Sequence, residues 1–347
     1  MRVVVAPDSF GGWKTAAEVA TLTARRLQQA GHTVHIRPMS DGGEGFLDAL
    51  HHGGHLTRRA QVSSCGPLGG PRQGYVGWLS GGQAVIESST WLRASTLSPW
   101  SATSVGLGRV LATHVASKAI IGLGGSSTVD MGVGALSALG VHPVDQHGRL
   151  VPASPGALHR IRGFRGDPID VSSWTVWADV STRLTRGAVV FGPQKGVSKN
   201  ALDDLQQQWM TVAHALQQWC HSTGRAPPDL ALTGGGAAGG LGFALAAMGA
   251  AIQPGVAAMT QLVLGDVDLE ADLLVTGEGR LDASSADDKV VHWLSSHCAR
   301  HGLHFAAIVG QRSDDAPELS GPVFVCGDGP DRDTAFMEAV EALVDHI

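Results

Sequence analysis

The chain has little charge and no basic segment, and this shortage excludes whole classes of partner. Of its 347 residues only 16% are charged, against about 25% in a typical soluble protein, and the formal net charge is −6. Without a basic block, the sequence offers no electrostatic surface for nucleic acid or for an anionic membrane. We therefore expect small-molecule partners, with neither nucleic-acid nor membrane binding.

Paired cysteines and long apolar runs are also missing. The four cysteines contain no C-x-x-C pair, which excludes a zinc ribbon and argues against a disulfide scaffold. The apolar run Val3 to Ala6 is shorter than the roughly 7–15 residues of a signal peptide, so we expect a cytoplasmic protein with reduced thiols. The uncharged stretch from Leu230 to Gly265 is interrupted by glycines and by Pro254, which favours a buried helix behind a glycine loop over a membrane span.

Glycine, in contrast, is abundant at 47 residues, about twice its usual share. Short β-branched runs lead into glycine turns, and helical patterns follow the turns, which is typical of parallel α/β units buried on both faces. We expect strands at residues 2–6, 34–36, 119–121, 174–177, 272–275, 305–309 and 322–325, and helices from the capping box at residues 15–18, after residue 128, over about 198–220 and near the end of the chain. Because such units occur at both ends while the middle is irregular, two domains should share the chain discontinuously, with the strands at Arg2 and Asp272 in one parallel sheet.

Acids and hydroxyls come directly after several of these strands. The turns are Asp8-Ser9, Asp41-Gly-Gly-Glu44, Ser126-Ser127-Thr128-Val129-Asp130 and Glu278-Gly-Arg280-Leu-Asp282. In parallel sheets ligands bind beyond the carboxyl ends of the strands, where glycine backbones present free N–H groups to oxyanions. Carboxylates beside such a cradle need a hard cation between them and a phosphate, which favours Mg²⁺ and phosphoryl transfer. Any single turn can be structural, but together they predict one cleft at which Asp8, Asp41, Ser126, Asp179 and Glu278 converge.

Several common motifs are absent. No Gly-Lys dipeptide occurs, so there is no Walker A loop, and no G-x-S-x-G elbow supports a hydrolase. Gly122-x-Gly124-x-x-Ser127 matches two positions of the dinucleotide fingerprint and leaves a nicotinamide oxidoreductase as a weak alternative. Lys195, on a Gly-Pro-Gln-Lys-Gly turn, is either a solvated charge or a phosphate contact.

At these residues the sequence resembles the type I glycerate kinases, the bacterial glycerate 2-kinase family, nearly from end to end. The matching stretches are Ala6-Pro-Asp-Ser-Phe10, Ala16-Ala-Glu-Val-Ala20, Asp41-Gly-Gly-Glu-Gly45, Gly66-Pro-Leu-Gly69, Gly124-Gly-Ser126, Phe191-Gly-Pro-Gln-Lys-Gly196, Gly236-Ala-Ala-Gly-Gly-Leu-Gly242 and Thr276-Gly-Glu-Gly-Arg280 with Asp282. The resemblance implies a two-domain α/β fold, with a Rossmann-like parallel-sheet domain and a smaller mixed α/β domain around a cleft. It also implies an Mg²⁺-dependent transfer of the ATP γ-phosphoryl group to the 2-hydroxyl of D-glycerate, giving 2-phosphoglycerate. We place the first domain at residues 1–60, 100–142 and 256–347, and the second at 61–99 and 143–255.

The chain departs from the family pattern inside its motifs. Gly11 stands where the family usually carries Lys, Val129 replaces an amide, and Ser181-Thr182 replace an Asp-Asn pair. Arg183, on the same shortened loop, either meets an anion in place of the lost charge or points to solvent. These changes leave two alternatives open: a degenerate homologue that binds a ligand without efficient turnover, and a kinase of a related hydroxy acid.

We assign candidate residues by the needs of phosphoryl transfer, which are positioning, charge neutralisation and a carboxylate that orients the attacking hydroxyl. Asp8 is the first choice for the base, although the sequence does not separate base from metal ligand among the acids. The expected catalytic residues are Asp8, Asp179, Glu278, Arg280 and Lys289; ATP is expected at Gly124, Gly125, Ser126, Ser127, Lys195, Gly235, Gly236 and Gly239; the hydroxy acid at Ser9, Asp41, Glu44 and Asp282; and Mg²⁺ at Asp179 and Glu278.

Overall fold

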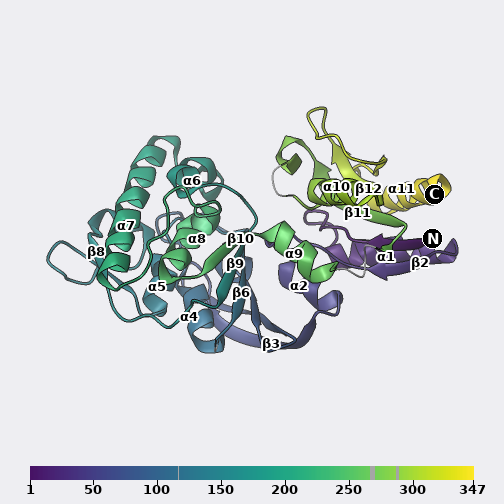
Figure 1. Ribbon diagram of the computed structural model, residues 1–347. Helices are drawn as coiled ribbons and strands as arrows, with labels where there is room; N and C mark the ends of the chain where they lie inside the picture. The colour runs from purple at the N-terminus through teal and green to yellow at the C-terminus, as the bar shows by residue number, and fades with distance from the viewer. Residues whose placement is uncertain (116, 266–269, 287–288) are drawn as a thin grey trace. The chain divides into compact units, whose positions relative to one another are not determined.

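The structure, a computed structural model, describes residues 1–115, 117–265, 270–286 and 289–347 (Figure 1). The chain divides into two compact units. Unit 1 consists of residues 1–41, 45–55 and 255–347, and unit 2 of residues 42–44 and 56–254.

The sheet of unit 1 is parallel throughout. Its strands lie in the order β13 (Val323–Val325), β12 (His304–Arg312), β11 (Leu273–Leu281), β1 (Arg2–Val5) and β2 (Thr33–Ile36). Val3 of β1 lies opposite Leu273 of β11, and both side chains are buried. The prediction that the strands at Arg2 and Asp272 share one parallel sheet is therefore confirmed.

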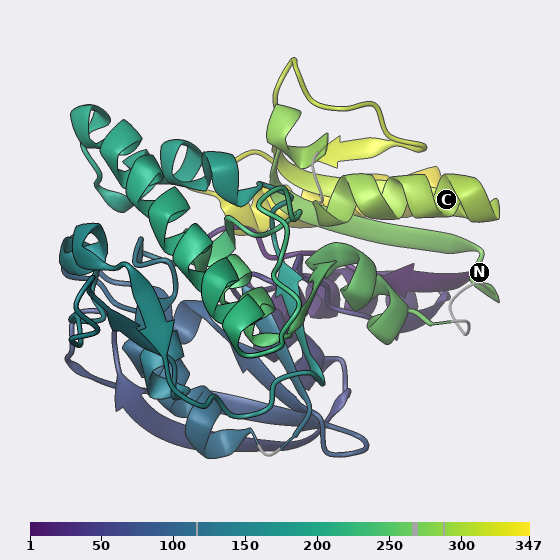
Figure 2. The same cartoon turned by 60° about the vertical axis from the view of Figure 1, so that its left-hand side comes forward.

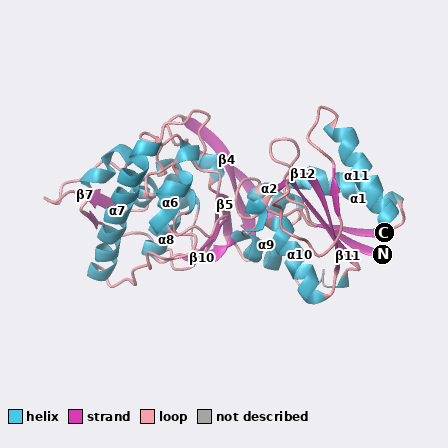
Figure 3. Cartoon of the chain, turned by 90° about the horizontal axis from the view of Figure 1, so that it is seen from above, coloured by secondary structure: helices cyan, strands magenta, loops and turns pink. Residues whose placement is uncertain are grey.

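Helices cover both faces of this sheet. They are α1 (Ala16–Gln29), α2 (Phe46–His52), α9 (Gly255–Val263), α10 (Val290–His301) and α11 (Arg332–His346), with a 3₁₀ turn η5 (Ala283–Ala286). Figure 3 shows α1 and α11 side by side against the strands, with α10 on the opposite side of them. Helix α1 begins at the expected capping box, in which the Glu18 N–H donates to Thr15 Oγ1 and the Thr15 N–H donates to Glu18 Oε2. The apolar side chains between these layers form the core of unit 1.

The main sheet of unit 2 is mixed. Its order is β10 (Ala251–Pro254), β9 (Trp174–Ala178), β6 (Ala119–Leu123), β5 (Ala84–Glu87), β4 (Pro71–Leu79) and β3 (Leu56–Cys65). Strands β5, β6, β9 and β10 are parallel, whereas β3, β4 and β5 pair antiparallel. A separate hairpin joins β7 (His142–Val144) to β8 (Gly163–Arg165).

Several helices pack on this sheet. The helical segments are α3 (Ser89–Leu92), α4 (Val105–His114), α5 (Val133–Ala138), α6 (Leu184–Phe191), α7 (Leu202–Ser222) and α8 (Ala237–Met248), with 3₁₀ turns η1 (Pro155–Arg160), η2 (Pro193–Lys195) and η3 (Lys199–Ala201). Helix α8 contacts β6, β9 and β10, and α6 and α7 pack on α8; α7 is the long teal helix in Figure 2. The uncharged stretch thus contains a buried helix behind a glycine loop, as expected, and no described helix is long and apolar enough to cross a membrane.

The fold class is confirmed, but one part of the expected domain division is wrong. Residues 100–142 belong to unit 2, because β6 pairs with β5 on one side and with β9 on the other. With this segment included, the unit that carries the mixed sheet is the larger of the two.

Candidate active site

Most of the predicted site residues line one of two pockets, one in each unit. The pocket of unit 2, called here the glycine-turn pocket, has a volume of about 540 Å³, and its lining includes Gly124, Gly125, Ser126, Ser127, Asp179 and Lys195. The pocket of unit 1, called here the acid pocket, has a volume of about 340 Å³, and its lining includes Asp8, Ser9, Glu278, Arg280 and Lys289.

The glycine-turn pocket begins where the adjacent parallel strands β6 and β9 end. Gly124-Gly125 follow β6, and Asp179 follows β9. A Cβ at Gly124 would lie 2.6 Å from Asp179 Oδ2 and 2.6 Å from Gly43 Cα, and Gly125 has a φ of +59°. Only glycine fits this turn, because the backbone approaches the Asp179 carboxylate too closely for a side chain.

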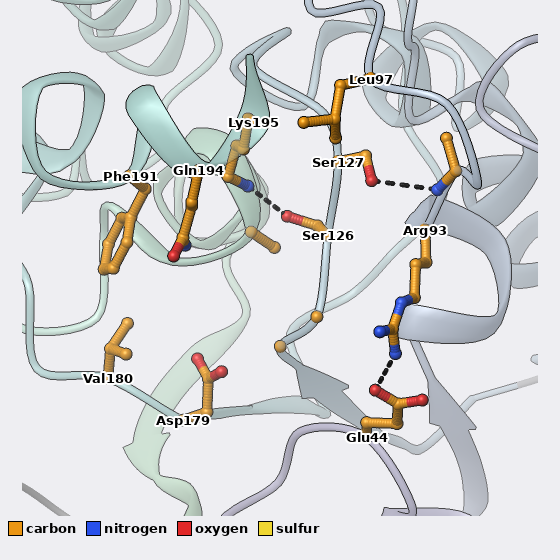
Figure 4. Close-up of a pocket in the computed structure, with 14 residues that line it drawn as sticks. Glu44, Arg93, Leu97, Ser126, Ser127, Asp179, Val180, Phe191, Gln194 and Lys195 are labelled. Atoms are coloured by element: carbon orange, nitrogen blue, oxygen red, sulfur yellow. Dashed lines mark hydrogen bonds and ion pairs between the residues drawn. The ribbon is translucent and has the colours of Figure 1, made fainter. Parts of the chain in front are cut away.

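Lys195 forms part of the wall of this pocket. It ends the 3₁₀ turn η2 and is only 4% exposed. Its Nζ donates to Ser126 Oγ at 2.5 Å and to the Thr128 carbonyl at 3.1 Å (Figure 4). Burial lowers the pKa of Lys195 to about 8, against the opposing attraction of Asp179 and Asp130. Lys195 is therefore not a solvated turn charge.

Other residues that line this pocket had no predicted role, and Arg93, Phe191 and Gln194 are among them. Arg93 forms an ion pair with Glu44, and both side chains are more than half exposed (Figure 4). Phe191 and Gln194 also line the pocket. Arg93 follows the short helix α3, outside any glycine turn, so no sequence pattern marked it.

The second glycine run packs against backbone. A Cβ at Gly239, where φ is +75°, would lie 2.0 Å from the Thr128 carbonyl oxygen, and a Cβ at Gly236 would lie 2.9 Å from the Arg183 carbonyl oxygen. Ala238 is the member of this run that lines the described pocket, and Gly235, Gly236 and Gly239 do not. These glycines allow close packing of loops, and their assignment to nucleotide binding stays a prediction.

Two departures from the family pattern lie away from the pocket. Val129 is buried in the core of unit 2, and its carbonyl accepts a hydrogen bond from Trp209 Nε1 at 3.0 Å. Arg183 is exposed at the start of α6 and lines neither pocket. The solvent interpretation of Arg183 is the one that this placement favours.

The acid pocket is built on the adjacent strands β1 and β11 of unit 1. Asp8 follows β1 and its N–H donates to the Gly277 carbonyl at 2.8 Å, while Glu278 is part of β11. Asp8 as a residue is half-buried, but loss of hydration around its carboxyl raises the pKa to about 8, and the Asp41 charge adds to this shift. Burial likewise raises the pKa of Glu278 to about 7. Glu278 Oε1 is buried without a hydrogen-bond partner in the described part of the chain.

The cations of the acid pocket are each paired with an acid. Lys289 Nζ contacts Asp41 Oδ2 at 2.5 Å, and Arg280 Nε lies 3.1 Å from Asp282 Oδ2. Asp41 and Asp282 are not among the lining residues of the acid pocket, but each contacts one of its lining cations.

Residues on the neighbouring strands complete the acid pocket. Gln311 comes from β12, and Asp328 and Arg332 come from the segment after β13. The rule that ligands bind beyond the carboxyl ends of parallel strands could have identified Gln311 and Asp328 after the predicted strands at 305–309 and 322–325. Gly11 also lines this pocket, whereas Lys14 does not and forms an ion pair with Asp333 at 2.7 Å.

The acids fit a magnesium ion shared with phosphates and do not form a protein cage. Within the described ranges, no three His, Cys, Asp or Glu side chains are grouped so that they could hold a metal. Mg²⁺ commonly takes only one or two carboxylates from a protein and its remaining ligands from water and substrate phosphates. The unpartnered Glu278 Oε1 and the half-buried Asp179 each fit this limited role.

The five residues expected at one cleft belong to different units. Asp8, Asp41 and Glu278 are in unit 1, whereas Ser126 and Asp179 are in unit 2. Their convergence stays a prediction.

Comparisons with known proteins agree with both the fold and the motifs. The model of the glycerate kinase family matches residues 3–344. A glycerate kinase of Bacillus subtilis strain 168 is 32% identical over 339 residues, covering 91% of this chain and 86% of the relative. The glycerate 2-kinase of Escherichia coli strain K12 is 31% identical over 342 residues, with the same two coverages of 91% and 86%. A crystal structure of a Salmonella typhimurium LT2 protein, assigned as glycerate kinase 2, superposes with a TM-score of 0.81 at 29% identity, covering 99% of this chain and 95% of that one. The chain belongs to the glycerate kinase family.

Proposed function

We propose that the protein transfers the γ-phosphoryl group of ATP to the 2-hydroxyl of D-glycerate and forms 2-phosphoglycerate. The observation that carries this proposal is the pair of carboxyls at the ends of β1 and β11, Asp8 and Glu278, whose pKa values are raised to about 8 and about 7. A carboxylate whose pKa lies near the working pH is a stronger base than an ordinary one, and this suits proton removal from an alcohol.

The acid pocket has groups of both signs that the hydroxy acid requires. Asp8 would accept the proton of the attacking hydroxyl in its ionised form. Arg280 and Lys289 would neutralise the carboxylate of the hydroxy acid, Arg280 by two parallel N–H donors. Ser9, whose N–H already donates to Asp8 Oδ1 at 2.6 Å, holds the carboxyl in place.

The glycine-turn pocket would bind the phosphates of ATP. The backbone of Gly124 to Ser127 can approach oxyanions closely, and the buried charge of Lys195 lies at the wall of the same pocket. Asp179 of unit 2 and Glu278 of unit 1 are each proposed as a ligand of Mg²⁺, which when bound neutralises charge on the phosphoryl oxygens.

A coupled assay with product identification tests this function. The purified protein is incubated with ATP, Mg²⁺ and a panel of hydroxy acids, ADP release is followed, and phosphorus NMR assigns the phosphorylated carbon. We expect fastest turnover with D-glycerate and phosphate at carbon 2. Phosphate at carbon 3 would overturn the proposed position, and no ADP release with any acid would overturn the kinase proposal.

A second candidate is a kinase of a larger or differently charged hydroxy acid. A Cβ at Gly11 would meet no atom within 4 Å, so the acid pocket has free space at the position where the family usually carries Lys. The same panel separates the two candidates, because a larger acid would then show a higher kcat/KM than D-glycerate.

A further inference from the structure

The buried lysine of the glycine-turn pocket has most of its hydrogen-bonding capacity committed inside the protein. An ammonium group has three N–H donors and no acceptor. Lys195 Nζ directs one donor to Ser126 Oγ at 2.5 Å and another to the Thr128 carbonyl at 3.1 Å. Although only 4% of its surface is exposed, the side chain lines the pocket together with residues of the Gly124–Thr128 turn.

This contact fixes what the Ser126 hydroxyl can do. A hydroxyl has one donor and two acceptor lone pairs. Because the lysine N–H uses a lone pair of Oγ, the O–H of Ser126 has to point away from Nζ. Within the described part of the chain, the contact with Lys195 is the hydrogen bond that Ser126 Oγ makes, and Ser126 lines the pocket. Its O–H is therefore available as a donor to a bound ligand.

The neighbouring serine shows the opposite arrangement. Ser127 Oγ accepts a hydrogen bond from the Ala94 N–H at 3.0 Å, and the Ser127 N–H donates to the Leu92 carbonyl at 2.8 Å. Figure 4 shows the hydroxyl of Ser126 turned toward Lys195 and that of Ser127 turned away from it. Ser127 ties the turn to the segment after α3, whereas Ser126 is tied to a cation.

The partner of this donor should be an unprotonated oxygen. A positive charge on the acceptor side of a hydroxyl polarises the O–H and strengthens its hydrogen bond to an anion. A neutral hydroxyl of a nucleotide would gain less from this polarised O–H than an anionic oxygen does, so phosphate oxygens fit this place best.

We propose that Lys195 is a positioning residue, which orients and polarises the Ser126 hydroxyl so that Ser126 donates a hydrogen bond to a phosphate oxygen of the bound nucleotide. This inference rests on the proposed function in one respect, that the glycine-turn pocket binds the nucleotide. It gives the direct phosphate contact to Ser126, and Lys195 acts through it.

A double-mutant cycle on ligand binding tests this. The dissociation constant of ADP is measured by calorimetry, without Mg²⁺, for the full chain, for Ser126→Ala, for Lys195→Met and for the double variant. Binding of adenosine, which lacks phosphate, is measured on the same proteins by saturation-transfer NMR. Ser198→Ala and Lys199→Met are the matched controls, since both residues are exposed, lie a few positions along the chain and line neither pocket.

We expect each single variant to bind ADP about tenfold more weakly, which is the usual loss for one hydrogen bond to a charged group. The double variant should bind ADP no more weakly than either single variant does, and adenosine should bind all of these proteins equally well. A hundredfold loss in the double variant would show that Lys195 contacts the phosphate independently, and would overturn the proposal. So would an equal loss of adenosine binding together with a lowered Tm, which indicates a purely structural lysine, or unchanged ADP binding in Ser126→Ala.

The outcomes keep this inference separate from the proposed function. ADP binding by the unchanged chain tests the nucleotide pocket, turnover of D-glycerate tests the reaction, and the cycle tests the lysine–serine pair. A chain that binds ADP with the expected cycle but phosphorylates no acid would retain the inference and lose the function. A chain that does not bind ADP would lose the inference as well.

Discussion

Burial raises the pKa of Asp8, an effect that its position after a strand does not predict. The carboxyl is attached to a backbone held by β11, and its Oδ1 accepts the Ser9 N–H. Desolvation and the charge of Asp41 keep the proton on Asp8 near neutral pH, while Lys289 opposes this. A base with this environment should be required for the chemical step and dispensable for nucleotide binding.

We expect Asp8→Asn to lower kcat on the best acceptor by a factor on the order of 10²–10⁴, because the amide cannot take the hydroxyl proton. Steady-state kinetics and ADP calorimetry measure the two quantities separately, and the dissociation constant of ADP should change less than twofold. Equal losses in kcat and in ADP affinity would contradict a role as base.

The same substitution should change how stability depends on pH. The pKa of Asp8 is about 8 in the folded chain, above the roughly 3.9 of an unfolded Asp, so folding favours the protonated carboxyl. The stability from this preference is fully present below about pH 4 and is lost as the pH rises to about 8. In thermal melts without metal or nucleotide, the Tm of Asp8→Asn minus the Tm of the unchanged chain should therefore increase between about pH 5 and pH 9.

Asp314→Asn is the matched control for these melts, since Asp314 is an exposed acid of the same unit. Its Tm should follow the unchanged chain across the whole pH range. Parallel curves for Asp8→Asn as well would mean that Asp8 titrates like an ordinary surface carboxyl.

At the level of elements, the glycine-rich turn at the start of α8 allows close packing against a neighbouring loop. Residues 238–240 have φ values of +49°, +75° and +87°, a left-handed turn that brings Gly239 against the 128–131 loop. The Gly239 carbonyl also accepts the Met131 N–H at 3.0 Å. This turn thus links α8 to the loop that carries Ser126 and Lys195's second acceptor, Thr128.

Gly239→Ala and Gly224→Ala separate crowding from backbone strain. Both glycines have a φ near +70°, at +75° and +72°, but a Cβ at Gly224 meets no atom within 4 Å. Each substitution carries the left-handed penalty of about 1–2 kcal/mol. Gly239→Ala should cost about 1–3 kcal/mol more from overpacking, seen as a lower midpoint in urea. Equal midpoints would mean that the loop moves aside freely.

The helices, strands and turns also show how much of the fold and of the site could be predicted from the sequence. Buried strands, acidic turns and the capping box at Thr15 follow from local patterns, and the structure has them. Local patterns do not show to which sheet a strand belongs. An apolar run such as β6 could equally be a buried strand of either unit. A glycine indicates left-handed or crowded backbone, but it does not indicate what causes the crowding. Gly124 lies beside a carboxylate of the pocket, whereas Gly239 lies against a backbone carbonyl. Arg93 had no local pattern, since its place in the pocket comes from tertiary packing.

At the level of the whole molecule, the two cores should respond separately to damage. Val275 of β11 is 1% exposed in the core of unit 1. Val275→Asp would bury an unpaired charge and should unfold unit 1, because the cost of several kcal/mol approaches the stability of a whole domain. Hydrogen exchange should then be fast in peptides of β1 and β11, while those of β6 and β9 stay protected and ADP still binds.

Val325→Asp is the control, because Val325 of β13 in the same unit is 52% exposed. It should leave exchange in β1 and β11 unchanged. Loss of protection in β6 and β9 after Val275→Asp would show that the two units form one cooperative body.

The pairing of β1 with β11 has a consequence for how the chain matures during translation. Val3 and Leu273 are register partners, yet the ribosome makes one before and the other after all of residues 56–254. Unit 2 is continuous apart from residues 42–44, so it can fold as it leaves the ribosome. Strand β1, in contrast, cannot pair with β11 until β11 has been synthesised. A nascent chain arrested far enough beyond β10 for that strand to have left the ribosome should resist protease over β3 to β10 and be cleaved near β1. The segment from β1 to Asp8, although made before unit 2, would then become native after it.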